Sequence, residues 1–90
     1  MSIAIYFGRV VKQLREQNRY SQEVLADRAS LNRTYLGEVE RGVAVPSLAT
    51  ITKIASAFNL STSELIARSE REEQQANFIP QEKSLEPSVA

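Results

Sequence analysis

The chain has 90 residues, no cysteine, no histidine and a formal net charge of zero. A chain of this length forms one domain with a modest core, and the missing cysteines exclude a disulfide framework and a thiolate metal site. No apolar run approaches the roughly 20 residues that cross a membrane, and the first residues carry no secretory pattern, so we expect a cytoplasmic protein.

Two helices are predicted in the first third of the chain. Apolar residues at helical spacing predict the first helix over residues 3–17. Its inward face is predicted to consist of Ile3, Phe7, Val10, Val11 and Leu14. Ser21 is a suitable N-cap for a second helix over residues 22–28, because its hydroxyl can accept from an otherwise unpaired amide. The inward residues of this second helix are predicted to be Val24, Leu25 and Ala29.

Three further helices are predicted after residue 31. Asn32 is a suitable N-cap for the third, which ends near Gly42, a residue suited to the left-handed conformation that closes many helices. Ser47 caps the fourth helix. The apolar stripe of that helix comprises Leu48, Ile51, Ile54, Ala55 and Phe58. At the start of the fifth helix, Ser61 and Glu64 form a capping box, in which each side chain is expected to bind the other residue's amide.

The composition changes after residue 68. Residues 1–68 carry nine Lys or Arg and six Asp or Glu, a balance of +3, whereas residues 69–90 carry two and five, a balance of −3. Pro80, Pro87 and scattered charges give the end of the chain no helical period. We therefore predict a mildly basic helical domain over 1–68, and over 69–90 an extension of the fifth helix followed by a flexible acidic tail.

The second and third helices are separated by only a short turn. Together they span residues 22–41, and two short helices this close must cross steeply, as in the helix-turn-helix motif. The crossing needs a small residue where the helices meet, and Ala26 is placed there. At the start of the third helix, Asn32, Arg33 and Thr34 would reach base edges if this helix lay in a major groove of DNA.

Several short stretches resemble, in order and spacing, the XRE family, the class of phage lambda repressor and Cro. The stretches are Ser21-Gln22-Glu23-Val24-Leu25-Ala26, Leu31-Asn32-Arg33-Thr34-Tyr35-Leu36, Val39-Glu40-Arg41-Gly42, Pro46-Ser47-Leu48 and Lys53-Ile54-Ala55. The resemblance covers residues 5–67 and implies an all-α, five-helix, lambda-repressor-like domain that binds DNA. The stretches at 31–35 and 39–42 further resemble controller proteins of restriction–modification systems.

The resemblance implies a sequence-specific transcriptional regulator of a (pseudo)palindromic operator in double-stranded DNA, and it assigns roles to single residues. Arg33, Thr34 and Glu38 occupy base-reading positions, and the fork of Arg33 suits guanine O6 and N7. Contacts with the DNA backbone are implied for Ser21, Gln22, Asn32, Tyr35 and Arg41. Arg15 and Glu40 match a paired position of the family and are expected to form a partly buried structural ion pair.

Two positions depart from the family's pattern. Ser30 stands where family members commonly carry glycine, because the turn often requires a positive φ, so a serine there implies strain or a different turn. The loop Val43-Ala44-Val45 is apolar where relatives often carry polar or basic residues that hold phosphates. The pattern therefore does not favour phosphate contacts at this loop.

A homodimer is expected, because one recognition helix contacts only a few base pairs and two-fold pairing doubles the contacts. The interface is predicted at the end of the fourth helix and along the fifth, where apolar residues exceed what one small core absorbs. These residues are Phe58, Leu60, Leu65 and Ile66. Phe78 and Ile79 are a further candidate arm of that interface.

Other functions remain open at the level of sequence. An antitoxin would bind DNA with the helical body and mask a toxin with its tail, where Phe78-Ile79-Pro80 is the relevant element. A protein-binding adaptor of the same fold is favoured by the absence of a broadly basic surface. The run Glu70-Arg71-Glu72-Glu73 is typical of a solvated helical face, with contact to RNA polymerase as its functional alternative. Without histidine or cysteine, and without clustered metal ligands, we expect no enzyme, no cofactor and no metal.

Overall fold

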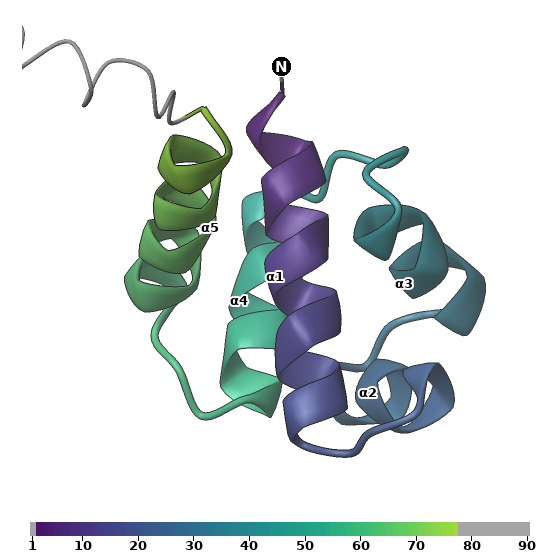
Figure 1. Cartoon of the computed structure of the whole chain (residues 1–90). Coiled ribbons are helices and arrows are strands. Elements are labelled where there is room, and N and C mark those ends of the chain that lie inside the picture. Colours follow the sequence, from purple (N-terminus) through teal and green to yellow (C-terminus); the bar gives the residue numbers. More distant parts are fainter. Residues whose placement is uncertain (1, 78–90) are drawn as a thin grey trace, which may run out of the picture.

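The computed structural model describes residues 2–77 and leaves residue 1 and residues 78–90 undescribed. Within the described range the chain forms helices and no strand, which confirms the predicted all-α class (Figure 1). The helices are α1 (Ile3–Gln17), α2 (Gln22–Arg28), α3 (Arg33–Glu40), α4 (Leu48–Ala57) and α5 (Thr62–Ala76). None of these helices is long and apolar enough to cross a lipid bilayer.

Each helix begins directly after a residue whose side-chain oxygen accepts a hydrogen bond from an amide of the first turn. The predicted caps Ser21, Asn32, Ser47 and Ser61 all do so, and Ser2 caps α1 in the same way. The Ser61 hydroxyl accepts from the Glu64 amide at 3.0 Å. The reciprocal half of the predicted capping box is missing, because the Glu64 carboxylate instead pairs with Arg68 at 3.0 Å.

Three helices are followed by a non-glycine residue with positive φ. Ser30, between α2 and α3, has φ 56°, so the serine adopts the left-handed conformation for which the family commonly uses glycine. Arg19 after α1 and Asn59 after α4 each have φ 59°. Gly42 has φ 77° and closes α3, as its position predicts.

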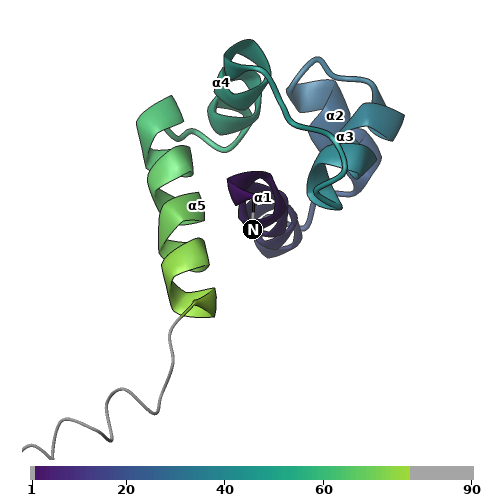
Figure 2. The same cartoon turned by 90° about the horizontal axis from the view of Figure 1, so that it is seen from above.

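α1 lies in the middle of the domain, with α2 and α3 on one side and α5 on the other (Figures 1 and 2). Buried side chains from all five helices meet around it in one core. The buried members of the core are Phe7, Val10, Val11, Leu14, Leu25, Ala26, Ala29, Leu36, Val39, Ile54, Ala55 and Leu65. Because α1 supplies four of them, it fixes where the α2–α3 pair stands relative to the rest of the chain.

Gly8 lets α1 and α3 touch backbone to backbone. A methyl group on this residue would overlap the carbonyl oxygen of Val39 and lie 2.6 Å from that of Glu40. No other residue type fits without moving the helices apart. The glycine therefore sets the distance between α1 and the C-terminal end of α3.

Four residues that the periodicity assigns to the core or to an interface lie elsewhere. Ile3, Val24 and Leu48 are exposed. Ile3 and Leu48 are the first residues of α1 and α4, and α2 turns Leu25 and Ala26, rather than Val24, toward the core. Leu65 has no exposed surface, so it cannot contact a partner.

The predicted boundary at residue 68 falls inside α5, which continues without a break to Ala76. The flexible acidic tail and the Phe78-Ile79-Pro80 element concern residues 78–90, which lie outside the described residues. Of the predicted interface residues, Phe58 and Leu60 are half-buried against the core, and the Phe58 ring stacks on that of Tyr20 at 6.2 Å between centroids. Ile66 is also half-buried.

Candidate nucleic-acid interface

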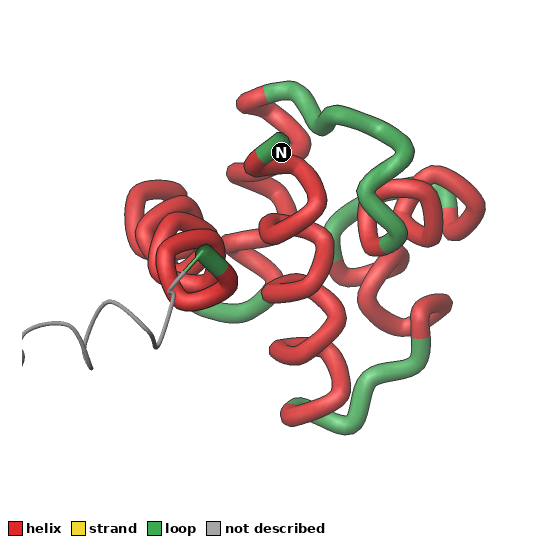
Figure 3. The backbone as a smooth tube through the Cα atoms, turned by 45° about the horizontal axis from the view of Figure 1, so that its top comes forward, coloured by secondary structure: helices red, strands yellow, loops and turns green. Residues whose placement is uncertain are grey.

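The helix-turn-helix unit consists of α2, a four-residue turn and α3, which Figure 3 shows as two short helical segments joined by one loop. Leu25 and Ala26 of α2 and Leu36 and Val39 of α3 are buried together in the core. In the turn, the Leu31 amide donates to the Ala26 carbonyl at 2.8 Å. This packing anchors one side of α3 and leaves the side with Arg33 and Thr34 facing solvent.

A hollow of about 210 Å³ opens on this outer side and is called here the α2–α3 hollow. Its lining residues are Gln22, Arg33, Thr34, Gly37 and Arg41. It therefore brings together two of the three predicted base-reading residues and two of the predicted backbone-contacting residues. Gly37 is buried beneath two of these side chains, because a methyl group there would lie 3.3 Å from Arg41 Nη1 and 3.7 Å from Gln22 Nε2.

The remaining predicted contact residues do not line this hollow. Ser21 and Asn32 are exposed, but each uses its side-chain oxygen to cap a helix. The Ser21 hydroxyl hydrogen and the Asn32 amide hydrogens are still available as donors to an acceptor such as phosphate. Tyr35 and Glu38 are half-buried. The DNA-contact roles of these four residues stay predictions.

The predicted ion pair between Arg15 and Glu40 is confirmed. Arg15 Nε donates to Glu40 Oε2 at 2.7 Å and Arg15 Nη2 donates to Oε1 at 3.2 Å, so the contact is bidentate. The two side chains are 13% and 3% exposed. The hydrogen bonds to Glu40 raise the pKa of the Arg15 guanidinium above its ordinary value, against the opposing effect of burial.

Glu40 also holds Gln22. The Gln22 Nε2 donates to Glu40 Oε1 at 3.0 Å, so one carboxylate joins α1, α2 and α3. One amide hydrogen of Gln22 remains free to donate to a phosphate oxygen. The contact fixes the rotamer of Gln22 at the edge of the α2–α3 hollow, where a backbone-positioning residue is required.

A second hollow, of about 480 Å³, adjoins the first on the side of α1 and is called here the α1–α3 hollow. Its lining residues are Arg9, Lys12, Arg15, Gln22, Glu40 and Arg41. Arg9 and Lys12 are not among the DNA-contact residues that the sequence predicts. Their spacing of three residues, repeated at Arg15, places the three cations on neighbouring turns of one helix. This pattern could have identified them.

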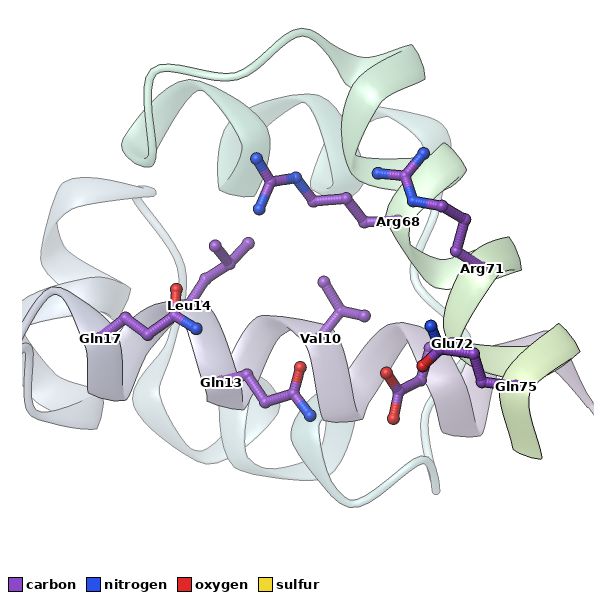
Figure 4. A pocket seen from close by; sticks show the side chains of 8 residues that line it. All are labelled: Val10, Gln13, Leu14, Gln17, Arg68, Arg71, Glu72 and Gln75. Atoms are coloured by element: carbon purple, nitrogen blue, oxygen red, sulfur yellow. The ribbon is translucent and has the colours of Figure 1, made fainter.

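A third hollow, of about 230 Å³, lies on the opposite side of α1, against α5 (Figure 4). Arg68 and Arg71 both stand over it, but both pair with Glu64, at 3.0 and 3.4 Å. Glu72 also lines it, so its two cations face two carboxylates. α1 separates it from α2 and α3 (Figure 2). It is not part of the helix-turn-helix face.

Residues 11–65 match the family HTH_3, described as helix-turn-helix. The control protein C.BamHI of Bacillus amyloliquefaciens is 38% identical over 66 residues, which cover 72% of this chain and 82% of that protein. The chain belongs to the HTH_3 family, the XRE class of helix-turn-helix regulators. HTH_3 proteins are DNA-binding transcriptional regulators and not enzymes, and we assign this chain the same general activity. Within residues 2–77, no three His, Cys, Asp or Glu side chains are grouped to hold a metal ion.

The chain is also similar to a controller protein of known structure and to a phage repressor. The restriction–modification controller protein C.AhdI from Aeromonas hydrophila is 40% identical, with a TM-score of 0.66, and the match covers 69% of this chain and 94% of that one. This match confirms the lambda-repressor-like fold. The immunity repressor protein of Bacillus phage phi105 is 32% identical over 76 residues, and the match covers 83% of this chain but only 53% of the repressor. The chain thus spans about half the length of the phage repressor.

Proposed function

We infer that this HTH_3 protein binds a (pseudo)palindromic operator as a homodimer and controls the genes of a restriction–modification system. The observation that carries the inference is the α2–α3 hollow, which Gln22, Arg33, Thr34 and Arg41 line together with Gly37. The match to control proteins C.BamHI and C.AhdI supports the narrower role.

The side chains of the hollow divide into two tasks. Arg33 and Thr34 stand exposed in the first turn of α3, and in a recognition helix that turn faces the base edges. Gln22 is locked to Glu40 at 3.0 Å, which suits a group that positions the protein on phosphate without reading sequence. Arg41 closes the other end of the hollow and is assigned to the backbone.

The dimer interface is assigned to an apolar surface formed by Ile3, Val45, Leu48 and Ile66. Val45 is 79% and Leu48 72% exposed, which is costly for large apolar side chains in a chain this small. Ile3, Val45 and Ile66 border one apolar hollow of about 150 Å³, and Leu48 starts the helix that follows. Of the four residues expected to form the interface, this assignment keeps Ile66 and leaves out Leu65, which is buried, and Phe58 and Leu60, which pack against the core.

The test is selection of bound sequences from a random DNA pool by the full chain. We expect enrichment of an inverted repeat whose half-sites are separated by about one helical turn, 10–10.5 base pairs from centre to centre. Enrichment of a single half-site would refute the dimer, and no enrichment would refute sequence-specific binding. In the genome, a controller's operator should lie upstream of a restriction or methyltransferase gene. An operator beside a small toxin gene would instead favour an antitoxin.

A further inference from the structure

The α1–α3 hollow contains a charge imbalance, and two of its cations, Arg9 and Lys12 on α1, have no role in the helix-turn-helix assignment. Of its charged side chains, Glu40 is paired with Arg15 at 2.7 Å. The other three, Arg9, Lys12 and Arg41, form no ion pair with any residue of the described range 2–77. A hollow with three uncompensated cations attracts an anion.

Contacts with neighbouring residues restrain two of these cations, and the packing of α1 against α3 brings the third beside them. The Arg9 guanidinium lies over the buried Tyr6 ring, 5.1 Å from its centroid, which restricts its rotamers. Arg41 Nη1 lies close over Gly37, 3.3 Å from where a methyl group on that residue would stand. Gly8 brings α1 into backbone contact with the end of α3, and this contact places the α1 cations beside Arg41.

The α1–α3 hollow continues directly into the α2–α3 hollow, because Gln22 and Arg41 line both. A line of cations therefore runs from Arg33 at the start of α3, past Arg41, to Lys12 and Arg9 on α1. A recognition helix in a major groove is bordered by the two phosphate backbones of the duplex. The line of cations starts on the recognition helix and continues onto the neighbouring helix α1. This is where one of the two phosphate backbones would pass.

We propose that Arg9 and Lys12 bind the sugar–phosphate backbone of duplex DNA next to the major groove that α3 enters, beside Arg41, which the proposed function already assigns to the backbone. The proposal rests on the proposed function and extends the DNA contacts from the helix-turn-helix onto α1. The contacts carry affinity and no sequence information. They also explain how a chain with zero net charge can bind DNA, because the cations that contact the phosphates lie on one face.

The experiment measures operator affinity of the full chain as a function of salt concentration. Each phosphate contact contributes about 0.9 to the slope of log affinity against log salt. The double variant Arg9→Gln/Lys12→Gln should therefore lower the slope by about 1.8, and Arg41→Gln by about 0.9. Affinity for the operator and for random DNA should fall by the same factor, and Arg9→Lys/Lys12→Arg should restore both.

The matched control is Lys53→Gln/Arg71→Gln, which removes two exposed cations from α4 and α5 and should leave the slope unchanged. Lys12→Gln alone, at an exposed position without packing, gives a second reading if the double variant is less stable. If the wild type binds the operator but the Arg9 and Lys12 variants keep its salt slope, this inference is overturned and the proposed function stands. A loss confined to the operator would make these residues base readers and overturn the inference too. Absence of DNA binding by the wild type would instead overturn the proposed function.

Discussion

Glu40 is buried, and three hydrogen bonds from two other helices offset the loss of water around its carboxylate. Two come from Arg15 and one from Gln22, all between 2.7 and 3.2 Å. Such a carboxylate is an obligatory partner: removing it leaves the Arg15 guanidinium buried without a counter-charge, which costs more than the pair itself contributes. The same residue therefore supports the fold and holds one side chain of the candidate DNA face.

Glu40→Ala should lower the free energy of unfolding by about 3–5 kcal/mol, the range for one partner removed from a buried pair. The measurement is urea denaturation followed by circular dichroism. Glu64→Ala is the matched control, since Glu64 and Arg68 are 42% and 39% exposed, and a loss of about 0–1 kcal/mol is expected there. Equal small losses for the two variants would show that the Arg15–Glu40 pair is not buried in solution.

Arg33 is the best single test of sequence reading, because it is exposed at the start of α3 and lines the α2–α3 hollow. Arg33→Ala should weaken operator binding by about 1–3 kcal/mol, the value of one bidentate contact to guanine. Titrations with operators changed one base at a time should show the penalty shrinking at one position. The same loss on every sequence would instead identify a phosphate contact.

Ser30 carries backbone strain that a glycine would relieve. A φ of 56° costs an L-residue about 1–2 kcal/mol that glycine would not pay. Glycine is more flexible in the unfolded chain, however, and this offsets about 0.5–1 kcal/mol of that gain. Ser30→Gly should therefore raise the free energy of unfolding by about 0.5–1 kcal/mol. Asn59→Gly, at φ 59°, should gain less because asparagine tolerates this region. Thermal unfolding compares the two, and a loss of stability in Ser30→Gly would contradict the strain.

At the scale of elements, helix starts were predictable because caps are local. Ser21, Asn32, Ser47 and Ser61 act within three residues of themselves, so the sequence alone places them. Which side of a helix end is covered depends instead on the neighbouring elements, and periodicity does not encode those. This is why Ile3, Val24 and Leu48 were wrongly assigned to the core.

Some residues of the candidate site were likewise predictable from local sequence, and others were not. The residues of α2 and α3 that line the α2–α3 hollow belong to one local motif, and the resemblance could place them. Arg9 and Lys12 join the site only because α1 packs against the end of α3, a contact between residues far apart in the chain. The left-handed Arg19 was likewise unpredictable, because arginine gives no local preference for positive φ.

Gly8 is the residue on which that contact between α1 and α3 depends. Gly8→Ala should lower the free energy of unfolding by about 1–3 kcal/mol, because the added methyl group overlaps backbone carbonyls that cannot move alone. Gly37→Ala is the control: its methyl group meets only the movable ends of Arg41 and Gln22, and alanine favours the helix by about 1 kcal/mol. In denaturant titrations, the free energy of unfolding should fall for Gly8→Ala and rise for Gly37→Ala. A Gly8→Ala protein as stable as the wild type would refute the backbone contact between α1 and α3.

At the scale of the whole molecule, two surfaces of opposite character lie on one small domain. The cationic line of Arg33, Arg41, Lys12 and Arg9 follows α3 and α1. The apolar surface lies where the α3–α4 loop passes the first turn of α1, as Ile3 and Val45 line one hollow. A protomer that binds DNA with the first surface leaves the second free for a two-fold related copy.

Leu48→Asp should give a folded monomer, because Leu48 is 72% exposed and a charge there disturbs no core contact. In a symmetric dimer each Leu48 lies near the two-fold axis or against its partner's apolar surface, so the substitution buries two carboxylates without a partner. Sedimentation at micromolar concentration should show the wild type as a dimer and the variant as a monomer. Operator affinity should fall by about 10²-fold or more, since the second half-site no longer binds as part of the same particle.

Ser56→Asp places the same charge at an exposed position further along α4 and should leave dimer and affinity intact. A Leu48→Asp protein that still sediments as a dimer would move the interface away from this surface, and a monomeric wild type bound tightly to a single half-site would exclude the dimer altogether.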